Sequence, residues 1–169
     1  YALGREAVDT THFRTPVPGF EPLPPGVPQG RTRALLKVQD GCDNYCTYCI
    51  IPYARGHIRS LPVESAVRQA VQLAGQGVHE IVLTGIEISS YGRDLDADVN
   101  LHMLIEAICR AVPQTRIRLG SLEPRTADKH LCALSQYPNL MPHFHLSLQS
   151  GCDSVLTRMK RKYTTALFY

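Results

Sequence analysis

Short apolar segments alternate with longer helical patterns from Arg33 onward, and this alternation constrains the fold more than any other feature. The segments expected to form strands are 33–39, 80–85, 116–121 and 143–148. The segments expected to form helices are 62–74, 101–112, 126–137 and 153–161. Strands that alternate with helices of about ten to fifteen residues predict parallel pairing, with the helices as crossover connections. We therefore expect an α/β fold with about four βα units.

Two of the helical segments carry apolar residues at helical spacing, which predicts one buried face on each. In the first, opened by Pro62 and ended by glycines, these residues are Val63, Val67, Ala70, Val71 and Ala74. In the second they are Leu101, Leu104, Ile105, Ile108 and Val112.

Residues 1–30 differ in composition from the rest of the chain. Six prolines in this stretch remove backbone donors and favour extended conformations, which predicts a linker. The chain has no initiating methionine, so we expect it to have been cut out of something longer. It has no signal peptide and no apolar run of about 18 residues, so we expect a soluble protein from a reducing compartment, the cytoplasm. Residues 31–169 form the expected core domain, and the net charge of +3 is too small to indicate a nucleic-acid binder by itself.

Ligands of parallel α/β folds bind at the loops that leave the carboxyl ends of the strands. The loop after the first strand contains Cys42, Cys46 and Cys49, whereas Cys109, Cys132 and Cys152 are scattered, which argues against a disulfide framework. Clustered thiolates suit zinc or an iron–sulfur cluster. Structural zinc needs four protein ligands, and His57 is the candidate for the fourth. A four-iron cubane held by three thiolates instead leaves one iron open to a small molecule.

The C-x3-C-x2-C spacing, with Tyr48 before the last cysteine, resembles the radical S-adenosylmethionine (SAM) superfamily. The segments "CTYCIIPYARGHIRS", "LTGIEISSYGRDL", "RLGSLEP" and "HFHLSLQSGCDSVLTRMKRKYT" resemble the tRNA methylthiotransferases, in particular the branch that acts on threonylcarbamoyladenosine beside the anticodon. The similarity covers about residues 31–165. It implies part of a (β/α)6 TIM-like barrel, of which about four units are present.

The resemblance implies a 4Fe–4S cluster whose open iron chelates SAM. An electron from the reduced cluster then cleaves SAM, and the 5′-deoxyadenosyl radical abstracts hydrogen from carbon 2 of the adenine. A second SAM supplies the methyl group, and sulfur comes through an auxiliary 4Fe–4S cluster. The resemblance also implies two further domains, an amino-terminal one that holds this auxiliary cluster and a carboxyl-terminal one that binds RNA. Neither is found in this chain, so we expect a fragment of the catalytic domain that is inactive alone.

By the same resemblance, the cluster ligands are Cys42, Cys46 and Cys49, and the residues near SAM are Tyr48, Gly85, Glu87, Glu123, Ser147 and Gln149. All of these SAM residues except Gly85 have a simpler interpretation. Tyr48 could shield the cluster from water, Glu87 could be a solvated loop carboxylate, and Glu123 could pair with Arg125. Ser147 and Gln149 are expected on one face of the fourth strand, toward the barrel interior, where bound water could also satisfy them.

Two basic groups are candidates for phosphate contact with tRNA, although charge runs are commonly solvated faces. They are Arg55, His57 and Arg59, and Arg158, Lys160, Arg161 and Lys162. Cys109 and Cys132 are expected to be buried as small apolar residues, and Cys152 lies on a loop.

Three functional alternatives remain open. The first is another radical SAM methylthiotransferase, which would act on a ribosomal protein or on isopentenyladenosine. The others are a zinc-binding interaction module and a ferredoxin-like electron carrier. The expected partners are tRNA and an electron donor such as flavodoxin or ferredoxin. No association with a membrane is expected.

Overall fold

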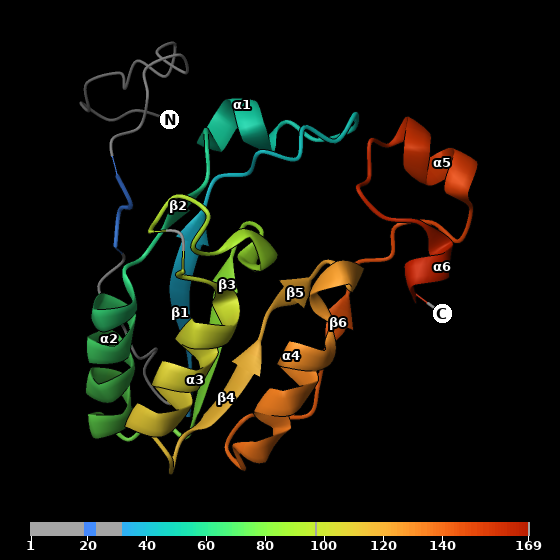
Figure 1. The fold of residues 1–169 in the computed structure, drawn as a ribbon. Coiled ribbons are helices and arrows are strands. Elements are labelled where there is room, and N and C mark those ends of the chain that lie inside the picture. Colours follow the sequence, from blue (N-terminus) through green and yellow to red (C-terminus); the bar gives the residue numbers. More distant parts are fainter. Residues whose placement is uncertain (1–18, 23–31, 97, 169) are drawn as a thin grey trace, which may run out of the picture.

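The computed structural model describes residues 19–22, 32–96 and 98–168, and it shows a curled sheet covered by helices (Figure 1). The predicted linker 1–30 lies outside the described residues except for 19–22. The first three predicted strand and helix pairs are present in the expected order. They are β1 Arg33–Asp40, α2 Val63–Gly75, β3 Glu80–Gly85, α3 Leu101–Ala111, β4 Arg116–Leu119 and α4 Lys129–Ala133.

The main sheet has the strand order β2-β1-β3-β4, and β1, β3 and β4 are parallel as predicted. β5 (Ser121–Leu122) and β6 (His145–Leu146) form a second, two-stranded parallel sheet. Only Gly120 separates β4 from β5, and its amide donates to the Leu83 carbonyl oxygen at 2.9 Å. The second sheet therefore continues the curvature of the first, and together they form part of a TIM-like barrel.

Helices α2 and α3 cover one face of this sheet and enclose its core (Figure 1). The five apolar residues predicted to face the core from α3 and its carboxyl end are all buried. On α2 the prediction was partly wrong: the buried residues are Ala66, Ala70 and Leu73, while Val71 is 48% exposed. Val63, Val67 and Ala74 are partly buried against the core, and Leu73 rather than Val71 is fully buried.

The segment predicted as one helix over 126–137 is broken into three short pieces. These are the 3-10 helix η2 (Pro124–Thr126), α4, and the 3-10 helix η3 (Leu134–Gln136). The Asp128 carboxylate accepts a hydrogen bond from the Leu131 amide at 2.8 Å, which starts a new helix after η2.

The fourth unit also differs from the prediction, because the strand expected over 143–148 is only the two-residue β6. The chain turns at Gln149, whose φ of 67° is incompatible with a continuing strand. The last predicted helix ends early as α5 (Asp153–Arg158), before Lys160 adopts φ 57°. A further helix, α6 (Thr165–Phe168), was not predicted.

Three short elements around the cysteine loop were also not expected. They are α1 (Ile51–Arg55), β2 (Arg59–Ser60), which is antiparallel to β1, and the 3-10 helix η1 (Ile88–Ser90). None of the described helices is long and apolar enough to cross a membrane.

Candidate functional site

The cysteine loop leaves the carboxyl end of β1 through Gly41, which only glycine can occupy. Its φ is 71°, and a Cβ there would lie 1.9 Å from the His57 carbonyl oxygen. The Cys42 amide donates to the Gly56 carbonyl oxygen at 3.1 Å, so the segment after α1 closes the loop from outside. The backbone thus fixes the first cysteine at the end of the strand.

All three cysteines of this loop are free thiols. Cys42 and Cys46 are 8% and 9% exposed, and Cys49 is half-buried. Burial raises the pKa of Cys42, the Asn44 amide opposes this, and the charges of Glu87, Cys46 and Cys49 add to the increase. Cys46 and Cys49 lie near enough to Cys42 for their charges to act on its thiol, and a positive metal centre would stabilise all three groups as thiolates.

Asp40, the last residue of β1, anchors the loop through several cations. Its carboxylate contacts Lys37 and Arg55 at 2.7 Å each and Arg59 at 3.6 Å. Burial alone would raise the pKa of Asp40, but hydrogen bonds from Arg55, Lys37 and the Gly41 amide lower it to about 2. Arg55 and Arg59 are therefore both paired with Asp40, Arg59 with a largely buried side chain and Arg55 with a side chain that is 47% exposed.

Gln39 joins the cysteine loop to the loop after β3. Its Nε2 donates to the Asp40 and Gly41 carbonyl oxygens at 2.9 and 2.7 Å, and its Oε1 accepts from the Glu87 amide at 2.7 Å. A Cβ on Gly85 would lie 2.8 Å from both the carbonyl oxygen and Oε1 of Gln39. Glycine at 85 is therefore required by the close approach of β1.

The Glu87 carboxylate is not a freely solvated group, because it caps η1. Oε1 accepts from the Ser89 amide at 3.1 Å, and Oε2 accepts from the Ser90 hydroxyl. The Ser89 hydroxyl oxygen in turn accepts a hydrogen bond from the Glu123 amide at 2.9 Å. The loops after β3 and β5 are thereby held together at one end of the sheet.

Glu123 is the most heavily contacted of the predicted SAM residues and is 3% exposed. Asn44 Nδ2 donates to its Oε1 at 3.1 Å, Arg161 contacts the same oxygen at 3.2 Å, and Arg125 Nε donates to Oε2 at 2.8 Å. The pair with Arg125, considered as the simpler role, is thus present. Glu123 also connects the cysteine loop with the segment after α5.

Ser147 and Gln149 do not share a strand face, because β6 ends before both of them. The Ser147 carbonyl oxygen accepts from the Tyr163 hydroxyl at 2.6 Å. Gln149 is exposed and has the left-handed φ that ends the strand direction. The prediction of alternate positions on one strand is therefore wrong.

The loop tip is exposed, and Tyr48 has 54% of its surface accessible. Partial burial raises the pKa of its phenol, with Cys46 adding to this and Arg161 opposing it.

His57, the candidate fourth zinc ligand, is directed to Asp43, with Nδ1 and Oδ1 2.7 Å apart. In the described part of the chain, no three His, Cys, Asp or Glu side chains are already gathered as a metal site.

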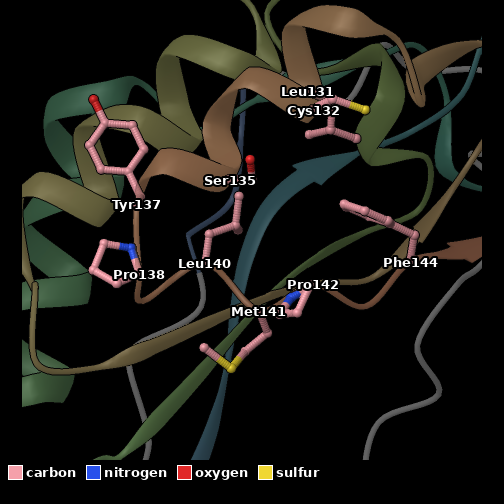
Figure 2. Close-up of a pocket in the computed structure, with 9 residues that line it drawn as sticks. All are labelled: Leu131, Cys132, Ser135, Tyr137, Pro138, Leu140, Met141, Pro142 and Phe144. Atoms are coloured by element: carbon pink, nitrogen blue, oxygen red, sulfur yellow. The ribbon is translucent and has the colours of Figure 1, made fainter.

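A separate apolar cavity of about 490 Å³ lies beside α4 and the segment that follows it (Figure 2). Its lining consists of Leu131, Cys132, Ser135, Tyr137, Pro138, Leu140, Met141, Pro142 and Phe144. Cys132 is exposed, so the prediction that it is buried was wrong, whereas Cys109 is buried as expected. Cys132 lies on the exposed side of α4, whose buried residue is Leu131.

Comparison with known families gives a match to the radical SAM superfamily over residues 36–168. This chain belongs to that superfamily. The matched range includes the cysteine loop, the loops after β3 and β5, and the segment that carries Arg161.

Among curated proteins, two relatives named threonylcarbamoyladenosine tRNA methylthiotransferase MtaB are similar over most of this chain. The one from Rickettsia prowazekii is 42% identical over 139 residues, 81% of this chain and 33% of that protein. The one from Bacillus subtilis is 44% identical over 139 residues, 82% of this chain and 31% of that protein. A tRNA-2-methylthio-N(6)-dimethylallyladenosine synthase of Lawsonia intracellularis is 42% identical over 137 residues, 78% of this chain and 30% of that protein. The chain spans about a third of the length of these relatives.

Among solved structures, the fold resembles the radical SAM methyltransferase TsrM of Kitasatospora setae. The structure with cobalamin and a [4Fe–4S] cluster has a TM-score of 0.64 at 16% identity, covering 79% of this chain and 26% of that one. A second, with tryptophan and a SAM analogue, has a TM-score of 0.65 at 16% identity and covers 80% of this chain and 26% of that one. This confirms the predicted partial barrel.

Sequence reasoning missed Asn44 and gave Arg161 a different role. Asn44 lies between two cysteines, where the spacing draws attention only to the thiols. Arg161 lies in a run of basic residues, which favours a solvated face. The signal that could have found them is the buried Glu123, which requires polar partners from elsewhere in the chain.

Proposed function

We propose that this chain is the catalytic core of a tRNA methylthiotransferase that modifies carbon 2 of N6-threonylcarbamoyladenosine next to the anticodon. The supporting observation is the convergence of three loops at one end of the curled sheet. The cysteine loop, the Gly85–Glu87 loop and Glu123 are joined by hydrogen bonds through Gln39, Ser89 and Asn44. This is the end at which parallel α/β folds bind their ligands.

The donor set fits the family's 4Fe–4S cluster. Cys42, Cys46 and Cys49 supply three soft thiolates from one short loop, and no fourth cysteine lies between residues 31 and 108. His57 is bound to Asp43 and 81% of its side chain is exposed, which weakens the zinc alternative. Three ligands would leave one position of the cluster for SAM.

The surroundings of Glu123 fit a polar cofactor. Asn44 Oδ1 and Arg125 Nη2 are buried polar atoms without a hydrogen-bond partner, and both residues contact the Glu123 carboxylate. Buried polar groups are costly unless they are hydrogen-bonded, and SAM offers both donors and acceptors. Glu123 would accept from ribose hydroxyls, and the Gly85–Glu87 loop would bind the cofactor's amino group.

When bound, the cluster and SAM supply one-electron cleavage of the sulfonium. The protein's own residues hold and orient these groups. Gln39 and Asp40 fix the base of the cysteine loop, Glu87 shapes η1, and Tyr48 would cover the adenine. An arrangement of this kind limits the access of water to a reactive site.

The substrate assignment follows the two MtaB relatives. The dimethylallyladenosine synthase is almost equally similar, so dimethylallyladenosine is the second candidate. Both would require tRNA as partner, a flavodoxin or ferredoxin as electron donor and an auxiliary cluster outside residues 31–169. We also propose a cytoplasmic location, where tRNA is modified.

Anaerobic reconstitution with iron and sulfide tests the cofactor. We expect about four irons per chain and a reduced-cluster paramagnetic resonance signal that changes on SAM addition, because SAM would coordinate the open iron. Cys46→Ala should lose the cluster, whereas the matched variant Cys109→Ala should keep it. One zinc per chain, or a cluster signal that SAM does not alter, would disprove the assignment.

The substrate is tested with the full-length gene product that contains this chain. Two tRNAs, one carrying threonylcarbamoyladenosine and one carrying dimethylallyladenosine, are supplied with reductant and SAM, and the methylthio nucleosides are measured by mass spectrometry. We expect product on the first tRNA only. Product only on the tRNA that carries dimethylallyladenosine would show that this nucleoside is the substrate instead.

A further inference from the structure

Arg161 lies in a run of basic residues, yet its side chain is only 8% exposed. Its Nη1 lies 3.3 Å from the Cys46 sulfur, and its Nη2 lies 3.2 Å from Glu123 Oε1. Arg161 thus bridges a predicted cluster ligand and the predicted ribose acceptor. Arg158, Lys160 and Lys162 are exposed, so the four basic residues do not form one phosphate-binding surface.

The backbone explains why Arg161 alone turns inward. Lys160 adopts φ 57°, and the Arg161 amide then donates to the Leu156 carbonyl oxygen at 2.9 Å, which reverses the chain after α5. The Thr47 amide and hydroxyl donate to the carbonyl oxygens of Met159 and Arg158 at 3.3 and 3.1 Å. These contacts hold the reversed segment against the tip of the cysteine loop.

Tyr163 secures the guanidinium from the other side. Arg161 Nε donates to the Tyr163 hydroxyl at 3.2 Å, and that hydroxyl donates to the carbonyl oxygens of Ser147 and Leu148 at 2.6 and 2.8 Å. The cation is therefore fixed in one orientation, with two nitrogens of its planar fork on different partners.

We propose that Arg161 is a positioning residue. Its contact with Cys46 raises the reduction potential of the cluster held by the cysteine loop, and its contact with Glu123 links that cluster to the ribose acceptor. This inference rests on the proposed function. On reduction the cluster takes one electron from a flavodoxin-type or ferredoxin-type donor, and negative charge on its cysteine sulfurs increases. A donor fixed at Cys46 stabilises that charge, since hydrogen bonds to ligating sulfur set the potential of iron–sulfur centres.

The test measures the midpoint potential of the reconstituted cluster by redox titration, followed by paramagnetic resonance, in the parent and three variants. Arg161→Gln removes the cation. Arg161→Lys keeps the charge, but a single ammonium cannot reproduce the two-nitrogen bridge. Arg158→Gln is the matched control, because it removes an exposed arginine from the same segment.

We expect Arg161→Gln to lower the potential by an amount that changes the reduction equilibrium roughly tenfold, about 59 mV for a one-electron couple. Arg161→Lys should lie below the parent, and Arg158→Gln should match the parent. Equal shifts in Arg158→Gln and Arg161→Gln would show a general charge effect and overturn the proposal. A parent-like potential in Arg161→Lys would also overturn it, even if Arg161→Gln failed to fold.

The outcome separates this inference from the proposed function. A parent chain that binds no iron–sulfur cluster defeats the proposed function itself. A parent cluster that responds to SAM, together with unchanged potentials in the Arg161 variants, defeats only the role of Arg161.

Discussion

Asp40 provides a quantitative test of how the cysteine loop is held. Its side chain is 4% exposed and contacts Lys37 and Arg59, whose side chains are 14% and 12% exposed. Asp40→Asn would leave these cations without their carboxylate, while keeping the size of the side chain. Breaking a buried charge cluster by removing one partner costs about 3–5 kcal/mol.

The pKa of Asp40 gives a second value for the contribution of this carboxylate to the stability of the fold. Its decrease from 3.8 to about 2 corresponds to about 2.5 kcal/mol of stability. A carboxyl whose folded-state pKa is lowered contributes fully above its unfolded value and loses that contribution as pH falls through the folded value. The Asp40 contribution should therefore be complete above about pH 5 and should decline toward pH 2.

The assay is urea unfolding of the cluster-free chain at pH 7, 5 and 3, for the parent, Asp40→Asn and the exposed control Asp96→Asn. We expect Asp40→Asn to lower the free energy of unfolding by about 2–4 kcal/mol at pH 7. The difference should shrink at pH 3, and Asp96→Asn should stay within about 0.5 kcal/mol of the parent. A pH-independent difference, or none at pH 7, would refute the argument.

Three further outcomes follow from the structure. Gly85→Ala should destabilise the chain by about 1–3 kcal/mol in urea unfolding because its Cβ has no room, whereas Gly75→Ala, with nothing within 4 Å, should be neutral or stabilising. Asn139→Ala should cost about 2–3 kcal/mol in the same assay, because the amide donates to three buried carbonyl oxygens, and a cost below about 0.5 kcal/mol would contradict this. Burial raises the pKa of Cys109 to about 11, so alkylation at pH 8 followed by mass spectrometry should modify exposed Cys132 quickly and Cys109 only in urea. Rapid labelling of Cys109 in the folded chain would count against that burial.

The order of strands and helices could be predicted from the sequence because local periodicity records which side of an element is buried. This succeeded for α3, where all five predicted apolar positions are buried. It was less accurate for α2, where neighbouring valines and leucine allow several faces, and for 126–137, where Asp128 starts a new helix. Short elements such as β2 and β6 carry too few residues to show a period.

The candidate site was predicted unevenly for the same reason. The cysteine spacing is a local pattern, and it identifies three thiolates within one loop without knowledge of the fold. The role of Gly85 depends on how closely β1 approaches, and the roles of Asn44 and Arg161 depend on Glu123, which is 79 and 38 positions away in the chain.

The sequence by itself determined the alternating α/β architecture and the position of the three-cysteine loop, because each depends on residues that are close along the chain. Only the tertiary structure decided which charges are free and which are buried. Arg59 is largely buried beside Asp40, and Arg161 beside Glu123, although their sequence context suggests a solvated surface. A buried ion finds its partner through space, since the cost of desolvation is offset by whichever opposite charge the fold brings near.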